Sequence, residues 1–311
     1  AAVAAHVVEK KEGFDLSLFA RLAIFFGYLR PQVVHTHNPQ SLVYAAAPAK
    51  AVWARTVHTK HGEAQERGRA LFLRRQAARF VDAFVSVSDR TEAFARTHRE
   101  ASGRKLLVIE NGVEIPPDRG DPEARSSSRE ALGIDSAAFV IGTIGRLQAV
   151  KNQALLIRAS APLLRRGGHL IIVGEGPERA GLETLIRSLD VGARVHLLGY
   201  QDDVGRWLAA FDCFAMSSRT EGLPLVLLEA MARGLPTVCT AVGGIRAAVG
   251  SAGELVDAGD EGGLTESLTR VAGDLEAAAV LGAAGRRRVI ERYSLATMVA
   301  RYDAVYRGLA R

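Results

Sequence analysis

The sequence predicts an α/β protein with two doubly wound domains, each a parallel sheet covered by helices on both faces. Three observations predict this fold. The chain has 311 residues, which is enough for two domains of ordinary size. Hydrophobic residues make up 48% of it, which excludes a disordered chain. Short apolar runs alternate with helical patterns almost throughout, and strand–helix–strand units with right-handed crossovers build parallel sheets.

The first part of the chain contains four apolar runs that are typical of buried strands. They lie at residues 32–36, 55–59, 83–87 and 105–109, with helical patterns at 65–80 and 89–99. No candidate for an opening strand with a Gly-rich turn precedes residue 32. We therefore expect this first domain to be incomplete.

A looser segment separates the two series. Asn111-Gly112 indicates a turn, and residues 116–122 together with the serines at 126–128 have the composition of a linker. We place the domain boundary there. The expected division is a first domain at 1–117, a second at 118–291, and a terminal helix at 292–311 that packs back towards the first domain.

The second part repeats the alternation. Strands are predicted at 139–142, 170–173, 195–198, 213–216 and 237–240, and helices at 152–165 and 225–233. Three amphipathic helices close the chain, the last over 295–308. Two such domains that face each other would form a cleft between the carboxyl ends of two sheets, where doubly wound folds bind ligands.

Charge and cysteine content limit the class of protein. The net charge is +6, but most of the positive charge comes from arginine, so we interpret it as a solvated surface rather than a nucleic-acid site. Cys213 and Cys239 lie in apolar runs and are predicted to be buried thiols, which favours a reducing, cytoplasmic location. No apolar run reaches the roughly 18 residues that span a bilayer.

One helical stretch is rich in arginine. It combines Leu71, Phe72 and Leu73 with a basic set, namely Arg67, Arg69, Arg74, Arg75 and Arg79. A basic amphipathic helix can lie on an anionic membrane, so peripheral contact with the inner face of the membrane is one interpretation. A solvated arginine face is the other.

The richest constellation runs from Ser217 to Ala232. A strand ends at the serines, a tight turn follows, and a helix starts near Pro224, where proline is favoured. The N–H groups of Leu225 and Val226 are then free to bind phosphate. Helical spacing would place Glu221 and Glu229 on one side, about 12 Å apart, as at opposite ends of one extended ligand.

Two further turns follow predicted strands. Gly145 permits close approach of a ligand, Arg146 can grip phosphate oxygens, and Lys151 adds a compact charge. Gly174-Glu175-Gly176-Pro177 resembles the start of a dinucleotide fingerprint, which fails because Arg179 occupies the third glycine position.

Histidines gather at two predicted strand ends, as His35 and His37 and as His58 and His61. His-x-His is a known spacing for metal ligands. However, no Cys or Asp cluster and no Asp-x-Asp pair accompanies it. We therefore expect hydrogen bonds from these imidazoles to a polar ligand, and no metal site.

Taken together, these motifs resemble the retaining glycosyltransferases of family 4 with the GT-B fold, the bacterial group 1 type, and the resemblance covers nearly the whole chain. It rests on an ordered set of segments: residues 31–37, 59–62 and 87–88, Asn111-Gly112-Val113, Gly145-Arg146-Leu147 with Lys151, Gly174 to Pro177, Glu221 to Glu229, Ala232 to Pro236, and Gly243-Gly244. The chain departs from the family at Arg246-Ala247, where Pro-Glu is usual. It also lacks the family's N-terminal strand and Gly-Gly loop, so the resemblance implies an N-terminally truncated chain.

The resemblance implies two Rossmann-like domains facing across a cleft, and a role for each matching residue. Arg146 and Lys151 would hold the donor diphosphate and stabilise the charge on the leaving nucleotide. Glu221 would bind sugar hydroxyls, Glu229 the ribose, and His61, with His58 as the alternative, the transferred sugar. The remaining substrate-binding residues would be His37, Gly145, Gly174, Gly199, Tyr200, Leu225 and Val226.

The implied activity is metal-independent transfer of a sugar, with retention, from a UDP- or GDP-sugar. The acceptor would be a polysaccharide, a glycolipid or another component of the cell envelope, and no cofactor is expected. Three alternatives stay open: a nucleotide-sugar epimerase, a sugar phosphorylase of the same fold, and a catalytically inactive nucleotide-binding fragment.

Overall fold

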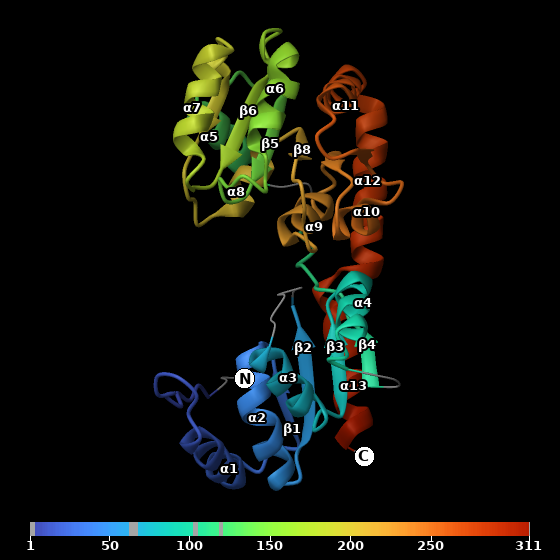
Figure 1. Ribbon diagram of the computed structural model, residues 1–311. Helices are drawn as coiled ribbons and strands as arrows, with labels where there is room; N and C mark the ends of the chain where they lie inside the picture. The colour runs from blue at the N-terminus through green and yellow to red at the C-terminus, as the bar shows by residue number, and fades with distance from the viewer. Residues whose placement is uncertain (1–3, 62–67, 102–104, 118–120, 311) are drawn as a thin grey trace. The chain divides into compact units, whose positions relative to one another are not determined.

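The computed structural model describes residues 4–61, 68–101, 105–117 and 121–310. Residues 65–67 of the expected helix, Gly62 and residues 118–120 of the expected linker lie outside these ranges. The chain divides into two compact units, one formed by residues 1–110 with 298–311 and the other by residues 111–297 (Figure 1).

The first unit contains a parallel sheet in the order β1-β2-β3-β4. Its strands are β1 (Val33–Thr36), β2 (Arg55–Lys60), β3 (Ala83–Ser86) and β4 (Leu106–Val108), at the predicted places. Its helices are α1 (Ser17–Leu29), α2 (Pro39–Ala51), α3 (Arg69–Ala78), α4 (Asp89–Thr97) and most of α13 (Leu295–Ala310). Phe84 packs with residues of α2 and α3, whereas Ala83 and Val85 pack with residues of α13. Alternation along β3 therefore fills a core on each face of this sheet.

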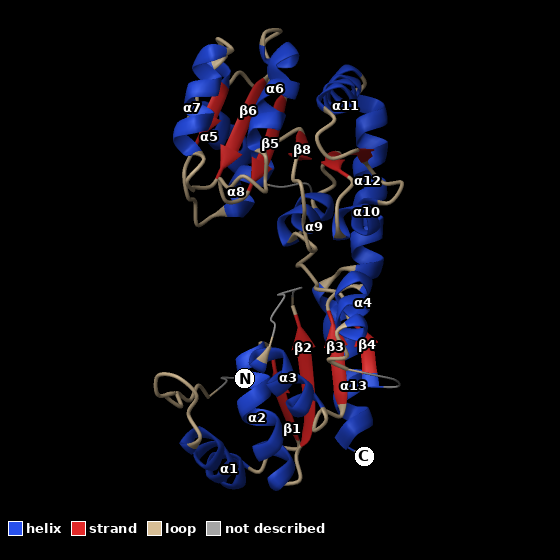
Figure 2. Cartoon of the chain, in the orientation of Figure 1, coloured by secondary structure: helices blue, strands red, loops and turns tan. Residues whose placement is uncertain are grey.

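The second unit contains a parallel sheet of six strands in the order β10-β9-β8-β5-β6-β7. The strands are β5 (Val140–Ile144), β6 (His169–Val173), β7 (Val195–Leu197), β8 (Cys213–Met216), β9 (Thr237–Thr240) and β10 (Glu254–Val256). The helices are α5 (Pro122–Glu130), α6 (Gln153–Leu164), α7 (Arg179–Ser188), α8 (Val204–Ala210), α9 (Leu225–Ala232), α10 (Gly244–Val249), α11 (Glu261–Gly273) and α12 (Leu275–Arg292). Helices flank the strands in both units, so the doubly wound α/β prediction is confirmed (Figure 2).

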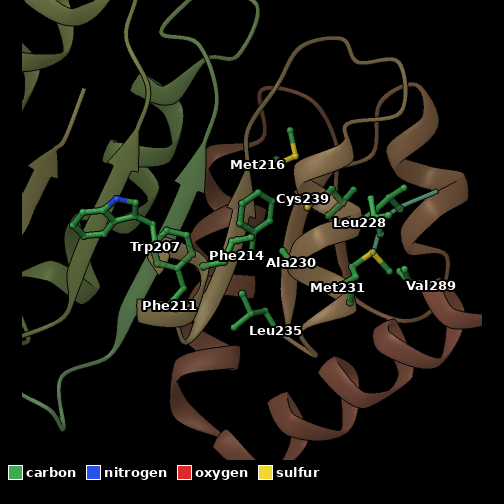
Figure 3. Close-up of a cluster of buried hydrophobic side chains, with 14 of the residues drawn as sticks. Trp207, Phe211, Phe214, Met216, Leu228, Ala230, Met231, Leu235, Cys239 and Val289 are labelled. Atoms are coloured by element: carbon green, nitrogen blue, oxygen red, sulfur yellow. The ribbon is translucent and has the colours of Figure 1, made fainter. Parts of the chain in front are cut away.

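Alternation along β8 shows how the second core forms. Phe214 and Met216 join a cluster built with α8, α9 and α12, whose side chains Figure 3 shows. Cys213 and Ala215 join the opposite cluster, with α6, α7 and α11. Cys213 and Cys239 are buried free thiols, as predicted, and burial raises the pKa of Cys239 to about 12.

The segment predicted as a linker is partly helical, which corrects the sequence interpretation. The serines at 126–128 lie inside α5, whose N-terminus is capped by the Asp121 side chain. Arg125 and Arg129 of this helix both bind the carboxylate of Asp212, at 2.5 and 2.7 Å. Contacts with residues more than eighty positions away hold this helix, so local composition did not reveal it.

Candidate functional site

Strand order locates the ligand-binding edge of the second sheet. The order runs outwards from β5 through β6 to β7 and outwards from β8 through β9 to β10, so the direction of winding reverses between β5 and β8. Open α/β sheets bind ligands beyond the carboxyl ends of the strands at such a reversal. The loops that follow β5 and β8 are therefore the candidate site.

These two loops are tied together by hydrogen bonds. The Arg219 N–H donates to the Val150 carbonyl at 2.8 Å. The Ser217 hydroxyl donates to the carbonyls of Lys151 and Asn152, at 3.2 and 2.9 Å. The loop carrying the predicted phosphate-binding cations thus has a fixed place beside the loop carrying Glu221.

Lys151 and Glu221, both predicted site residues, form an ion pair. Lys151 Nζ lies 2.6 Å from Glu221 Oε1, and the Ser218 hydroxyl donates to the same oxygen at 2.6 Å. The Lys151 side chain keeps 26% of its surface exposed, whereas Glu221 keeps 8%. A partly exposed lysine paired with a buried carboxylate can be reached by an anionic ligand from solvent.

Arg146 is exposed on the same edge. The Gln153 side-chain amide donates to the Arg146 carbonyl at 2.9 Å, which fixes the backbone beneath the guanidinium. Ser218 and Gln153 were not among the predicted site residues. Ser218 stands three residues before Glu221, a spacing typical of local side-chain hydrogen bonds, and that was the available signal.

The predicted glycines form a tightly packed rim. Gly145 N–H donates to Val173 O at 2.9 Å, and Gly174 N–H donates to Gly199 O at 2.8 Å. Gly174 has φ +141°, and a Cβ there would lie 2.0 Å from the Gly145 carbonyl oxygen. The loops after β5, β6 and β7 can therefore meet only with glycine at this position. Tyr200, which follows the rim, is 74% exposed.

Helix α9 begins at Leu225, as predicted, and no described side chain caps its N-terminus at Pro224. Leu225 is exposed and Val226 is half-buried. Glu229 lies half-buried within the helix. Glu221 lies four residues before the first residue of α9, so the helical spacing used to relate Glu221 to Glu229 was wrong: the intervening residues are not helical.

The histidines of the first unit separate into an exposed pair and a buried pair. His37 Nδ1 lies 3.1 Å from His61 Nε2, and both side chains are exposed. His58 is only 3% exposed, and its Nδ1 lies 2.8 Å from the Thr36 hydroxyl oxygen. Burial lowers the pKa of His58 to about 3 and that of His35 to about 4. Only His37 and His61 of the four are placed to meet a ligand from solvent.

Arg74 is buried, whereas both interpretations of the basic helix place it on the surface. It is 3% exposed, and its guanidinium lies 3.5 Å from the carboxylate of Glu100, which Lys60 also binds at 2.8 Å. Arg67 lies outside the described residues. Arg75, in the last turn of α3, is half-buried, and Arg79, which directly follows the helix, is exposed.

Among the described residues, no group of three or more His, Cys, Asp or Glu side chains could hold a metal ion. In the same part of the chain, no helix is long and apolar enough to cross a membrane.

Comparison with known proteins identifies the family. Residues 2–115 match Glycosyltransferase Family 4, and residues 138–274 match Glycosyl transferases group 1. The chain belongs to the family 4, group 1 glycosyltransferases.

This glycosyltransferase chain is 31% identical to N-acetyl-alpha-D-glucosaminyl L-malate synthase of Bacillus anthracis over 186 residues, 59% of the chain and 49% of the relative. It is 29% identical to D-inositol 3-phosphate glycosyltransferase of Corynebacterium urealyticum over 245 residues, 71% of the chain and 58% of the relative. The chain thus spans about half the length of the curated relatives it matches.

Solved structures confirm the GT-B fold. A glycosyltransferase from Rickettsia africae aligns with TM-score 0.88 at 18% identity, over 98% of this chain and 84% of that one. Anabaena Alr3699/HepE in complex with UDP aligns with TM-score 0.83 at 22% identity, over 94% of this chain and 82% of that one. At 18% and 22% identity, these likenesses establish the fold alone.

Proposed function

We propose that this glycosyltransferase chain transfers a sugar, with retention and without a metal, from a UDP- or GDP-sugar to a polysaccharide, glycolipid or other cell-envelope acceptor. The observation that carries the proposal is the Lys151–Glu221 pair at the switch point of the second sheet, next to the uncapped start of α9. Relatives named as glycosyltransferases, and the UDP in the Anabaena protein, support it.

In this proposal the donor diphosphate lies between Arg146 and the start of α9. Lys151 exchanges the Glu221 carboxylate for a phosphate oxygen, which frees Glu221 to accept hydrogen bonds from sugar hydroxyls. The two cations and the N–H groups of Leu225 and Val226 stabilise the charge that develops as the nucleotide leaves. The acceptor hydroxyl attacks the anomeric carbon from the face that the diphosphate leaves, the bond from that carbon to the phosphate oxygen breaks, and this oxygen accepts the hydroxyl proton. No side chain then needs to act as nucleophile or as base.

Calorimetric titration with UDP- and GDP-sugars tests the donor site. Glu229→Ala should weaken nucleotide binding about tenfold or more, whereas Lys151→Ala should mainly lower kcat. Arg158→Ala is the matched control, because it removes an exposed cation paired with Glu261 on the α6–α11 side of the same unit. A folded sample that binds none of these nucleotide sugars overturns the proposal.

Product analysis separates the alternatives. An epimerase converts the donor with no acceptor present, a phosphorylase requires inorganic phosphate, and an inactive nucleotide-binding chain binds the donor without turnover. A transferase forms a glycosylated product only when the acceptor is supplied. Retention is read from the anomeric configuration of that product.

We also propose a cytoplasmic location with peripheral contact to the anionic inner face of the membrane. The supporting feature is the accessible part of α3 and the residues just after it, where Phe72 is 58% exposed and Phe80 42% exposed, alongside Arg75 and Arg79. Arg79→Glu should reduce flotation with anionic liposomes. Arg287→Glu, which reverses an exposed charge in the second unit, is the control. Equal flotation of both variants and the wild type removes this contact.

A further inference from the structure

Two tyrosines of α13 contact the histidine cluster at the carboxyl edge of the first sheet. Tyr306 Oη lies 2.6 Å from His35 Nδ1. The other ring nitrogen, His35 Nε2, lies 2.8 Å from the Thr59 hydroxyl oxygen, which is itself 2.9 Å from Tyr302 Oη. Both nitrogens of His35 therefore have a hydroxyl partner, and two of the three hydroxyls in this chain of contacts come from a helix about 270 residues further along the sequence.

This arrangement constrains the ring of His35. Burial lowers the pKa of His35 to about 4 and raises the pKa of both tyrosines, so at neutral pH the ring is uncharged and both phenols are protonated. A neutral imidazole has one N–H and one lone pair. With hydroxyls on both sides, one nitrogen donates while the other accepts, and the plane of the ring is fixed by both bonds.

The ring of His37 also packs against the ring of His35. The ring centroids of His35 and His37 are 4.0 Å apart, and those of His37 and His61 are 5.4 Å apart in a stacked arrangement. A rotation of His35 would displace the ring of His37 and its contact with His61. We propose that Tyr302 and Tyr306 are positioning residues for the His37–His61 pair, acting through Thr59 and His35.

The inference rests on the proposed function, together with the expectation from the sequence that His61 contacts the transferred sugar and that His37 is a substrate-binding residue. Under it, α13 does more than pack on the sheet through Met298, Val305 and Leu309. Its tyrosine hydroxyls decide which imidazole nitrogens face the ligand. Loss of one hydroxyl should therefore lower kcat more than it lowers the affinity for the donor.

The first measurement follows the histidine rings of the full chain by NMR with ¹⁵N-labelled histidine, which reports the tautomer of each imidazole. Tyr306→Phe keeps the aromatic packing and removes one hydroxyl, so the ring-nitrogen signals of His35 and His37 should shift. Val305→Ala is the matched control: it weakens the packing of the same helix and should leave those signals in place. Tyr28→Phe controls for the loss of an exposed hydroxyl in the same unit.

The second measurement is steady-state transfer. Tyr306→Phe should lower kcat about three- to tenfold and leave KM for the donor within about twofold, while Val305→Ala keeps kcat near that of the wild type. Unchanged signals of His35 and His37 in Tyr306→Phe, or an equal loss of kcat in Val305→Ala, would overturn the positioning role alone. A wild-type chain that binds no nucleotide sugar would overturn the proposed function instead.

Discussion

The carboxyl edges of the two sheets have different chemistry. The first edge contains hydroxyls and imidazole rings. The imidazoles are neutral at physiological pH, because loss of solvation, partial for the exposed His37 and His61, lowers the pKa of each histidine in the cluster. The second contains close-packed glycine backbone, the exposed Arg146 and the Lys151–Glu221 ion pair. Neutral rings can exchange hydrogen bonds with sugar hydroxyls, whereas fixed cations and backbone N–H groups suit phosphate. Each edge by itself therefore has the chemistry for a different kind of group, sugar hydroxyls at the first and phosphate at the second.

The largest effect is expected at the glycine rim of the second edge. Gly174→Ala would place a methyl group 2.0 Å from the Gly145 carbonyl oxygen at a φ that favours glycine, so we expect a loss of about 3 kcal/mol in the free energy of unfolding. Gly145→Ala is the control, because its added Cβ meets no atom within 4 Å. Urea denaturation measures both variants. Equal stabilities would show that backbone contact does not build this rim.

The first edge should respond to acid. The pKa of His58 is about 3 and that of His35 about 4 in the folded state, below the usual value near 6.5. Between about pH 6.5 and pH 4 the unfolded chain binds more protons, so the stability present above pH 6.5 decreases as the pH falls, by on the order of 2 to 3 kcal/mol for each of the two imidazoles. Urea denaturation at pH 7 and pH 4.5 measures this loss.

A control variant identifies the source of the acid response. His58→Gln removes one of the buried imidazoles and should flatten the pH dependence while lowering stability at pH 7, since the Thr36 hydroxyl loses its imidazole partner and keeps the longer contact, 3.4 Å, with the Val57 carbonyl. His169 of the second unit also has a pKa lowered to about 4 by burial, so His169→Gln tests the contribution of the other unit. A pH dependence that survives His58→Gln but not His169→Gln would reverse the assignment.

The Lys151–Glu221 pair at the second edge should have an intermediate effect. Lys151→Ala leaves the buried Glu221 carboxylate with the Ser218 hydroxyl as its one remaining side-chain partner among the described residues, so we expect a loss of about 1 to 2 kcal/mol in the free energy of unfolding. Glu221→Gln in the same chain should recover part of it, since the buried group is then neutral. A double-mutant cycle measures the coupling. Strict additivity of the two changes would mean that they do not interact.

Periodicity along the sequence predicted most of the fold. The strands β8 and β9 have the predicted bounds, and the other predicted strands differ by one or two residues at one end or at both. The short strand β10 was missed because Glu254–Val256 contains a charge and is only three residues long. Helix α5 was missed because it is stabilised by ion pairs between its arginines and the distant Asp212, and local composition does not reveal such tertiary contacts.

The candidate site likewise combines features that local motifs predict with features that depend on tertiary contacts. Local motifs predicted the glycine turns, the start of α9 and the strand-end histidines, because each depends on neighbours in sequence. Sequence could not predict that Lys151 pairs with Glu221, seventy residues away, or that Tyr306 reaches His35. The sequence also could not predict which charged side chains are buried. Arg74 was interpreted as a surface charge, yet it lies beside Glu100 in the interior.

The smallest effect on stability is expected at Tyr200, the exposed aromatic ring of the second edge. The carboxylate of Asp202, which accepts a hydrogen bond from the phenol, raises the pKa of Tyr200, but the ring itself is 74% exposed. Tyr200→Ala should therefore change the free energy of unfolding by no more than about 0.5 kcal/mol. If the second edge binds the donor, the same variant should lower donor affinity about threefold, since an exposed ring gains contacts only when a ligand covers it. Tyr28→Ala, at a tyrosine of the first unit that is 83% exposed, should change neither quantity. Calorimetric titration of both variants distinguishes a ligand-facing ring from an ordinary surface one, because only the former can alter affinity without altering stability.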